Sequence, residues 1–324
     1  MTKPAWRRTA SETQIRKKDM ETDHYRLGCC GRELDLRTKP RIMAILNTTP
    51  DSFFDGGRLG GNDSSTVDVD HAVEIALGMI GNGAEIVDIG GESTRPGAEA
   101  VGAAEEIRRT APVIRELRRA SDVIISIDTY KAVVAEEALK AGASIVNDIS
   151  GFRFDPDIAP VCARHKAAVI LMHSRNQPGK MGWSYQTGSS GKDILSIVHR
   201  TLLDAIRQAE QHGIGDIVLD PGFGFGKSVG ENFALLRRLP ELLDLERPLL
   251  AGLSRKSFLG AAIRKTGEPL PAPQERLAAT VAANTVAIMN GASIIRVHDT
   301  KEAVHAAAVA SAVLRTGRDE GRGF

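Results

Sequence analysis

Short runs of apolar, often β-branched residues recur along the chain, each about as long as a strand covered on both faces. They occur at 41–46, 85–89, 123–127, 144–147, 168–172, 216–219, 248–251 and 293–297. Between them lie longer segments, such as 103–120 and 193–213, in which apolar residues recur with the spacing of one helix face. Eight strands alternating with eight helices predict an α/β fold of one domain, a closed parallel (β/α)8 TIM barrel, in preference to an open doubly wound sheet.

The ends of the chain follow a different pattern. Residues 1–23 are polar and mixed in charge, which predicts a mobile N-terminal tail; the barrel is assigned to 24–316 and a C-terminal tail to 317–324. Alternation around the Gly-Cys-Cys-Gly turn at 28–31 predicts a short N-terminal hairpin. Three of the helical segments end in glycine directly before a strand, where a left-handed residue is expected to end the helix.

Composition narrows the range of functions. Lys and Arg total 42 against 41 Asp and Glu, and this balance argues against a nucleic-acid partner. We expect no membrane partner either, because no stretch approaches the roughly 18 apolar residues of a spanning helix. The three cysteines (Cys29, Cys30 and Cys162) fit neither a common metal spacing nor a disulfide framework, and with the lack of a signal sequence they predict a cytoplasmic protein.

Polar side chains stand where the predicted strands end, which is the edge at which a barrel carries its active site. They are Asn47, Glu92, Thr94, Arg95, Asp128, Asn147, Asp148, Met172, His173, Asp220, Ser254, Arg255, Lys256, Arg296 and His298. The acids and amide at 128, 147 and 220 suit a flat nitrogen heterocycle. The cations after strands seven and eight suit an anion, since barrels often hold phosphate there. The set predicts a ligand with a polar ring at one end and a phosphate at the other.

The loops refine this prediction. The first one, residues 47–66, is long and Gly-rich, which is typical of a lid. The glycines of 222–226 let backbone approach a flat ligand, and Phe225 is expected either to pack on that ligand or to fill the barrel mouth. His173 lacks metal-ligand spacing and is expected to have a structural or hydrogen-bonding role, and Asp148 is expected to cap a helix or tie a loop. The sequence holds no G-x-S-x-G and no Cys–His constellation for nucleophilic hydrolysis.

Nine motifs in order resemble the dihydropteroate synthase family. They are MAILNTTPDSFFDGG (43–57), DIGGESTRPGA (88–98), SIDTYK (126–131), IVNDISG (145–151), LMHSRNQP (171–178), LDPGFGFGK (219–227), GLSRKSFLG (252–260), ERLAATVA (275–282) and IIRVHD (294–299). The resemblance implies the same barrel and a transferase of folate biosynthesis. Its reaction joins 6-hydroxymethyl-7,8-dihydropterin pyrophosphate to p-aminobenzoate, giving 7,8-dihydropteroate and pyrophosphate, with Mg²⁺ assisting.

The resemblance also implies a role for each matching residue. The pterin ring would be hydrogen-bonded or packed by Asp128, Asn147, Asp220, Lys256, Met172 and Phe225. The pyrophosphate would be held by Arg95, Asn47, Arg296 and His298, with Asn47 also ligating the magnesium. The p-aminobenzoate pocket would be bordered by Thr94, Pro96, Phe53 and Ser254. Catalytic roles are expected for Lys256, Asp51, Arg95 and Asp128, of which Asp51 would help the first loop close over the site.

Two other functions remain alternatives. A methyltetrahydrofolate-binding barrel of corrinoid-dependent methyl transfer shares the ring-binding acids and amide but needs no pyrophosphate site. A non-catalytic pterin-binding paralogue would show damage at the pyrophosphate and lysine positions, and none is seen. Small residues in the last two helical segments, 280–289 and 302–313, allow close helix contact and predict a homodimer.

Overall fold

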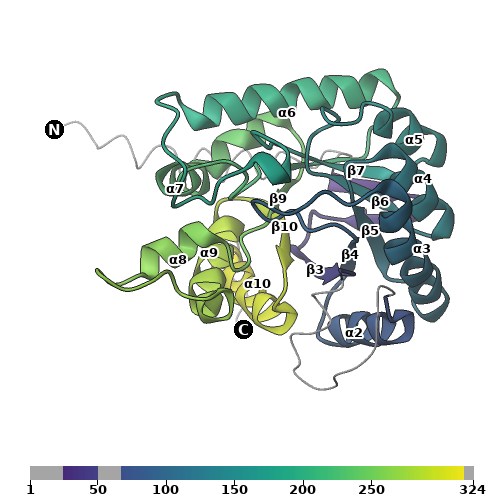
Figure 1. The fold of residues 1–324 in the computed structure, drawn as a ribbon, viewed down its shortest axis with the longest axis horizontal. Helices are drawn as coiled ribbons and strands as arrows, with labels where there is room; N and C mark the ends of the chain where they lie inside the picture. Colours follow the sequence, from purple (N-terminus) through teal and green to yellow (C-terminus); the bar gives the residue numbers. More distant parts are fainter. Residues whose placement is uncertain (1–24, 50–66, 317–324) are drawn as a thin grey trace.

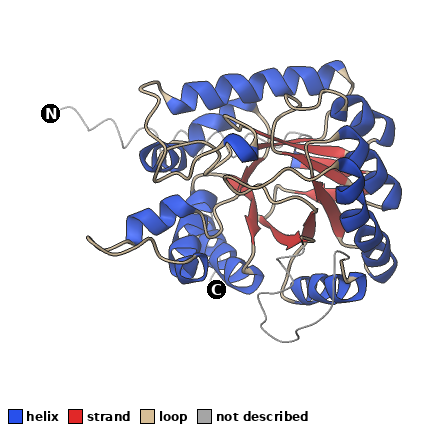
Figure 2. Cartoon of the chain, in the orientation of Figure 1, coloured by secondary structure: helices blue, strands red, loops and turns tan. Residues whose placement is uncertain are grey.

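The computed structural model describes residues 25–49 and 67–316. In this part of the chain eight parallel strands close into a barrel, surrounded by helices (Figures 1 and 2), which confirms the predicted fold. The barrel strands are β3 (Arg41–Asn47), β4 (Ile86–Gly90), β5 (Ile124–Asp128), β6 (Ile145–Asp148), β7 (Ala168–Met172), β8 (Ile217–Asp220), β9 (Leu249–Ala251) and β10 (Ala292–Val297). Closure is made by β10, which pairs with both β3 and β9.

The helices follow the strands in the expected alternation, with one exception. They are α2 (Val69–Gly81), α3 (Ala103–Ala120), α4 (Ala132–Ala141), α5 (Ile158–His165), α6 (Ile194–Gln211), α7 (Val229–Arg237), α8 (Ser257–Ile263), α9 (Leu277–Met289) and α10 (Thr300–Arg315), with short 3-10 turns at Pro178–Lys180, Leu239–Leu245 and Pro273–Arg276. Two helices, α8 and α9, follow β9 where the sequence pattern predicted one. The Pro-rich stretch 267–274 separates them, because proline cannot continue a helix.

Several predicted strands end one residue too early. Asn47, Asp128, Asp148 and Asp220 are the last residues of their strands and not the first residues of loops. Their backbones continue the parallel register, with Asp128 opposite Asn147 and Asp220 opposite Met172. A strand pairs through its backbone, so a charged side chain at the barrel mouth does not end it.

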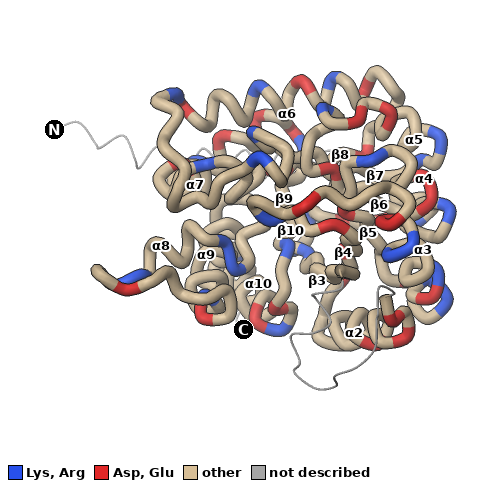
Figure 3. The backbone as a smooth tube through the Cα atoms, viewed as in Figure 1, with Lys and Arg blue, Asp and Glu red and all other residues tan. Residues whose placement is uncertain are grey.

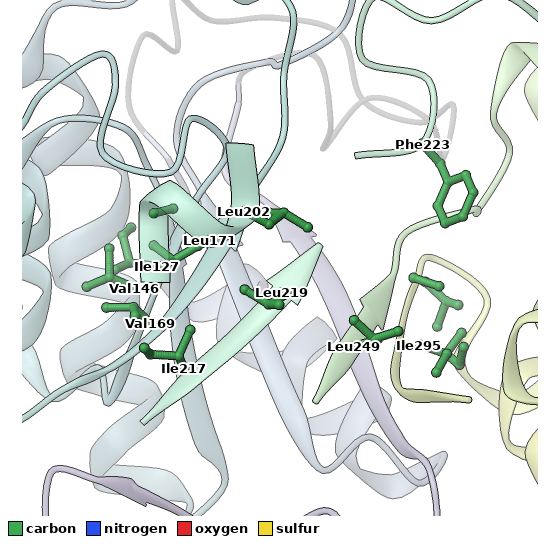
Figure 4. Packing of buried hydrophobic residues seen from close by; sticks show 14 of the residues in the cluster. Ile127, Val146, Val169, Leu171, Leu202, Ile217, Leu219, Phe223, Leu249 and Ile295 are labelled. Atoms are coloured by element: carbon green, nitrogen blue, oxygen red, sulfur yellow. The ribbon is translucent and has the colours of Figure 1, made fainter. Parts of the chain in front are cut away.

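Side chains alternate between the two faces of each strand, as the two-residue period of a strand requires. Outward residues such as Val146, Val169 and Ile217 pack with the helices in the main hydrophobic core (Figure 4). Inward apolar residues form a second cluster with the N-terminal hairpin, β1 (Arg26–Cys29) and β2 (Arg32–Asp35). The predicted hairpin therefore closes the amino-terminal end of the barrel, where Gly28 N–H also donates to Asp216 (2.7 Å).

Glycine stands at the helix–strand junctions that the sequence singled out. Gly83, Gly142 and Gly291 have φ of 98°, 120° and 99°, in the region that only glycine enters freely. Gly142 is the C-cap of α4, and a Cβ there would lie 2.8 Å from Cγ of Arg118. Among the described residues no helix is long and apolar enough to cross a membrane.

Candidate active site

The site is built at the carboxyl ends of the barrel strands by the strand period. Residues of the inner apolar cluster include Ile86, Ile124, Ile145, Val218 and Ile294. Polar residues two or four positions further along the same strands share their inward face, and these are Asp88, Asp128, Asn147, Asp220 and Arg296. Both signs of charge consequently meet near the ends of β4, β9 and β10 (Figure 3).

Arg296 is the centre of the charged cluster. Its Nε donates to Oδ2 of Asp88 and its Nη2 to Oδ2 of Asp128, both at 2.6 Å. Asn147 Nδ2 donates to the same Asp88 oxygen at 3.0 Å. Burial opposes the charge of Arg296, but the two carboxylates outweigh burial and raise its pKa. The guanidinium thus ties three strands together at the barrel mouth.

Asp128 keeps one carboxylate oxygen for a ligand. Burial raises the pKa of Asp128 to about 7, although Arg296 acts in the opposite direction. Its Oδ1 is buried and has no hydrogen-bond partner among the residues that the structure describes. A buried acceptor without a donor is costly, so this atom is suited to a donor on a bound molecule.

Asp88 is a site residue that sequence reasoning missed. It is fully buried, and its second carboxylate oxygen also lacks a partner within residues 25–49 and 67–316. For the second apolar run, 85–89, only residues 92, 94 and 95 were considered as candidates, whereas Asp88 lies inside the run. The available signal was an acid two residues after the inward-facing Ile86 in a strand that is otherwise apolar.

Asp220 is held by the loop that follows β8. Gly222 N–H donates to its Oδ1 at 2.6 Å, and burial raises the pKa of Asp220. The buried Lys227 ammonium donates to the carbonyls of Gly222 (2.6 Å) and His173 (3.1 Å). Burial lowers the pKa of Lys227 well below its usual value. Lys227, for which we predicted no role, thus fixes the loop that orients Asp220.

An apolar group covers the charged cluster. Met172 and Phe225 pack with Ile149 and Met181, and Phe225 is only 9% exposed. The Lys256 ammonium lies 4.2 Å from the centre of the Phe225 ring, a cation–π contact. Burial lowers the pKa of Lys256 to about 8, with nearby Arg296 acting in the same direction. The structure therefore brings Met172, Phe225 and Lys256 together beside Asp128 and Asp220.

His298 lies on a side of the mouth where several guanidinium groups are near. Its Nδ1 lies 3.0 Å from Ser254 Oγ, and its backbone N–H donates to the same oxygen. Its pKa falls to about 3, mainly through burial and then through the positive charges of nearby groups that include Arg296, Arg255 and Arg95. Three guanidinium groups acting on one imidazole indicate a pocket suited to a multiply charged anion.

Arg255 was expected from the sequence to bind the anion, but in the structure its guanidinium pairs with a carboxylate. Its guanidinium makes a two-pronged contact with Asp299, at 3.1 Å from Nε and 2.6 Å from Nη2. This carboxylate compensates much of its charge. Arg95 is exposed, which leaves it accessible to a ligand.

The other predicted residues fall into two groups. Asn47 ends β3, and its Oδ1 lies 3.9 Å from the place of a Cβ on Gly90, while Asp128 Oδ2 lies 3.8 Å from the same place. Thr94 and Pro96 are half-buried on the loop after β4. Asp51 and Phe53, like the two predicted tails, lie outside the described residues.

Two residues have the structural roles expected of them. Asp148 ties its loop, accepting from the N–H groups of Ser150 (2.8 Å) and Phe152 (2.6 Å). His173 is buried, and burial lowers its pKa to about 2. In the part of the chain that the structure describes, no group of three His, Cys, Asp or Glu side chains is placed to hold a metal.

Comparison with known proteins gives a consistent result. Residues 43–298 match the model of a family described as pterin binding enzyme. A dihydropteroate synthase of Synechocystis sp. is 46% identical over 276 residues, which cover 85% of this chain and 90% of that protein.

Solved structures agree. A Xanthomonas albilineans dihydropteroate synthase with 4-aminobenzoic acid is 41% identical, with a TM-score of 0.77 over 90% of this chain and 98% of that one. The same organism's enzyme in complex with 7,8-dihydropteroate is 40% identical, with a TM-score of 0.74 over 89% and 98% of the two chains.

Proposed function

Because the chain belongs to the pterin-binding enzyme family and is a dihydropteroate synthase, we propose how its residues divide the work of that reaction. The enzyme joins 6-hydroxymethyl-7,8-dihydropterin pyrophosphate to p-aminobenzoate and releases pyrophosphate. The observation that carries the assignment of roles is the convergence of three ring-binding side chains, Asp128, Asn147 and Asp220, beneath an apolar cover and beside a cationic pocket.

The pterin ring lies between the charged cluster and the cover. Asp128, Asn147 and Asp220 present acceptors and a donor to the ring edge, and the unpartnered Oδ1 of Asp128 receives a ring N–H. Met172 and Phe225 pack on the ring faces. Lys256 donates to an acceptor on the ring. Its ammonium is held at the barrel mouth by its contact with the Phe225 ring and lies near Asp128 and Asp220.

The pyrophosphate occupies the cationic pocket. Arg95 and Arg296 supply positive charge and the neutral imidazole of His298 supplies a hydrogen bond, with Asn47 next to them at the end of β3. As the bond between the pterin methylene and the pyrophosphate oxygen breaks, the electron pair leaves with the pyrophosphate. Fixed cations stabilise the charge that develops there, and the anionic Asp128 stabilises the cation that is delocalised over the pterin.

Magnesium fits this site as an ion that binds with the substrate. Mg²⁺ takes few protein oxygens and prefers to complete its shell with phosphates and water. Asn47 Oδ1 is a suitable hard ligand, and Asp51 is proposed to act nearby. When bound, the ion supplies further neutralisation of the leaving group.

The amine of p-aminobenzoate then attacks the methylene carbon, forming the C–N bond and losing a proton to solvent. An arylamine is largely neutral at pH 7, so no strong base is needed. Thr94, Pro96 and Ser254 border its pocket, and we assign Phe53 to the same pocket. Entry of the amine after the pterin pyrophosphate keeps water from the cation.

A binding experiment tests these roles. Calorimetry with dihydropterin pyrophosphate should show that Asp220→Ala weakens affinity, because one charge-assisted hydrogen bond is worth about 1.5–3 kcal/mol. Glu116→Gln, which breaks an exposed ion pair with Arg119 on α3, is the control and should bind like the wild type. Unchanged affinity in Asp220→Ala would refute the ring-binding role.

We also propose a homodimer formed through α9 and α10. Val286 and Met289 on α9 and Val309 and Val313 on α10 are large, exposed apolar residues. Each pair lies on one face of its helix, and the two helices pack side by side. Light scattering after size exclusion should give twice the chain mass for the wild type and the monomer mass for Val309→Glu/Val313→Glu. A wild-type monomer would refute the proposal.

The free thiols of Cys29, Cys30 and Cys162 support a reducing compartment. We therefore propose the cytoplasm as the place of action.

A further inference from the structure

One buried carboxylate fastens the loop after β4 at both of its ends. Glu92, at the start of the loop, is 7% exposed. Its Oε2 accepts from the backbone N–H of Val101, at the far end of the loop, at 3.3 Å. Its Oε1 accepts from the Tyr130 hydroxyl at 2.5 Å. The turn that carries residues 94–96 is thus closed across its base by a single side chain.

The same carboxylate joins the loop to two helices. The Lys131 ammonium, at the N-terminus of α4, contacts both Glu92 and Glu106. Glu106 belongs to α3 and is 1% exposed, and its burial raises its pKa. A lysine held between two buried carboxylates gives the loop one defined place relative to α3 and α4, because its ammonium contacts both of them at once.

The backbone leaves little room for the loop to shift. Arg109 Nη1 donates to the carbonyl of Gly91 at 2.9 Å. A Cβ on Gly91 would lie 2.9 Å from Cγ2 of Thr110 and 3.0 Å from Cγ of Glu106, so the loop rests directly on α3. On the opposite side, Gly97 N–H donates to the carbonyl of Pro178 at 3.3 Å. The turn at 94–96 is supported from both sides.

We propose that Glu92 is a positioning residue of the reaction, which sets the places of Thr94 and Arg95 and acts on the substrates only through them. This inference rests on the proposed roles of Thr94 at the p-aminobenzoate pocket and Arg95 at the pyrophosphate. The pterin ring lies on other strands, at β5, β6 and β8. Glu92 reaches that side through Tyr130, which packs against the apolar group of Met172 and Phe225, so we expect ring binding to change less than binding at the turn. A displacement of about 1 Å in a binding group is enough to cost two orders of magnitude in rate.

The experiment compares ligands that do and do not depend on the turn. In Glu92→Gln the side chain keeps its size but has one oxygen, which cannot serve Val101, Tyr130 and Lys131 together. We expect the KM for p-aminobenzoate and the Kd for inorganic pyrophosphate to rise on the order of tenfold. The Kd for 6-hydroxymethylpterin, which lacks the pyrophosphate, should stay within about twofold, because Glu92 reaches the groups that bind the ring indirectly, through Tyr130.

Milder and matched variants keep the test decisive. Tyr130→Phe retains the ring, which packs edge-on against Phe154, and removes one hydrogen bond to Glu92; it should shift the same two constants by less. Glu137→Gln breaks an exposed pair with Lys140 on α4 and should behave like the wild type.

A double-mutant cycle separates positioning from general loosening. If Glu92 acts through Arg95, then Glu92→Gln should weaken pyrophosphate binding much less in an Arg95→Ala background than in the wild type. Equal losses in both backgrounds, or equal losses for pyrophosphate and for 6-hydroxymethylpterin, would overturn the inference. If Arg95→Ala itself leaves pyrophosphate binding unchanged, the proposed role of Arg95 fails and the inference fails with it. If Arg95→Ala weakens binding and Glu92→Gln does not, only the inference fails.

Discussion

Replacing Asp88 with asparagine removes the charge that holds the centre of the site. Asp88 Oδ2 receives Arg296 Nε at 2.6 Å and Asn147 Nδ2 at 3.0 Å, and the residue is fully buried. An amide oxygen in the place of Oδ2 still accepts both bonds, and the amide NH₂ takes the place of Oδ1, which has no partner among the described residues, so the change removes the charge but keeps the contacts. Removing one partner of a buried ion pair costs about 3–5 kcal/mol. Asp128 keeps its own contact with Arg296, so we expect a loss of about 3 kcal/mol in the free energy of unfolding.

The same change has a second, electrostatic effect. The negative charge of Asp88 is one of the causes that raise the pKa of Asp128. Its removal should lower the pKa of Asp128, so the acid limb of the pH profile of kcat/KM for the pterin substrate should move to lower pH. A simple loss of structure would instead reduce kcat/KM at every pH and leave the acid limb at the same pH, so the two effects can be told apart.

Urea unfolding at pH 7.5 and a pH–rate profile measure the two effects. Glu116→Gln, which breaks an exposed pair with Arg119, is the control, and such pairs contribute about 0–1 kcal/mol. The reasoning is refuted if Asp88→Asn unfolds within about 0.5 kcal/mol of the wild type, or if its acid limb does not move.

Three further predictions follow from the same geometry. With pKa values of about 7 for Asp128 and about 8 for Lys256, kcat/KM should rise as pH passes 7 and fall above 8. Lys256→Arg should abolish the fall, and an unchanged alkaline limb in that variant would contradict the assignment. Burial lowers the pKa of His173 to about 2, so the unfolded chain binds its proton from about pH 6.5 downward and stability falls by about 1.4 kcal/mol per pH unit below that point; urea unfolding at pH 7.5 and 5.5 should show a shallower loss in His173→Asn. Gly222→Ala places a Cβ 2.0 Å from the carbonyl oxygen of His173. It should lose much more stability than Gly267→Ala, where φ is also positive but the added Cβ would meet open space. Equal thermal midpoints for the two variants would argue against the tight loop.

The sequence predicted the fold because the barrel rests on local periodicity. Runs such as 123–127 and the helical segment at 103–120 lie within one or two residues of β5 and α3. The extra helix α8 was missed because its seven residues are too few to show a helical period. Strand ends were set too early because a charged residue such as Asp128 ends an apolar run but not a hydrogen-bonded strand.

The site could be predicted only in part. The residues that end strands, such as Asn147 and Asp220, are marked by polarity at a fixed place in the pattern. Asp88 requires knowledge of which face of β4 points inward, and the pairing of Arg255 with Asp299 requires a contact across 44 positions of the chain. Likewise, the hydrogen bonds from Lys227 to the carbonyls of His173 and Gly222 cannot be predicted until the loops after β7 and β8 are placed together.

Turnover tests the central claim most directly. Purified protein is mixed with dihydropterin pyrophosphate, p-aminobenzoate and Mg²⁺, and 7,8-dihydropteroate is followed by chromatography, with Lys256→Ala beside the wild type. The account predicts product from the wild type and a loss of roughly a hundredfold or more in the variant, as expected when a charged group at the reacting centre is removed. A wild-type protein that binds the pterin but forms no product, or a variant as active as the wild type, would contradict it.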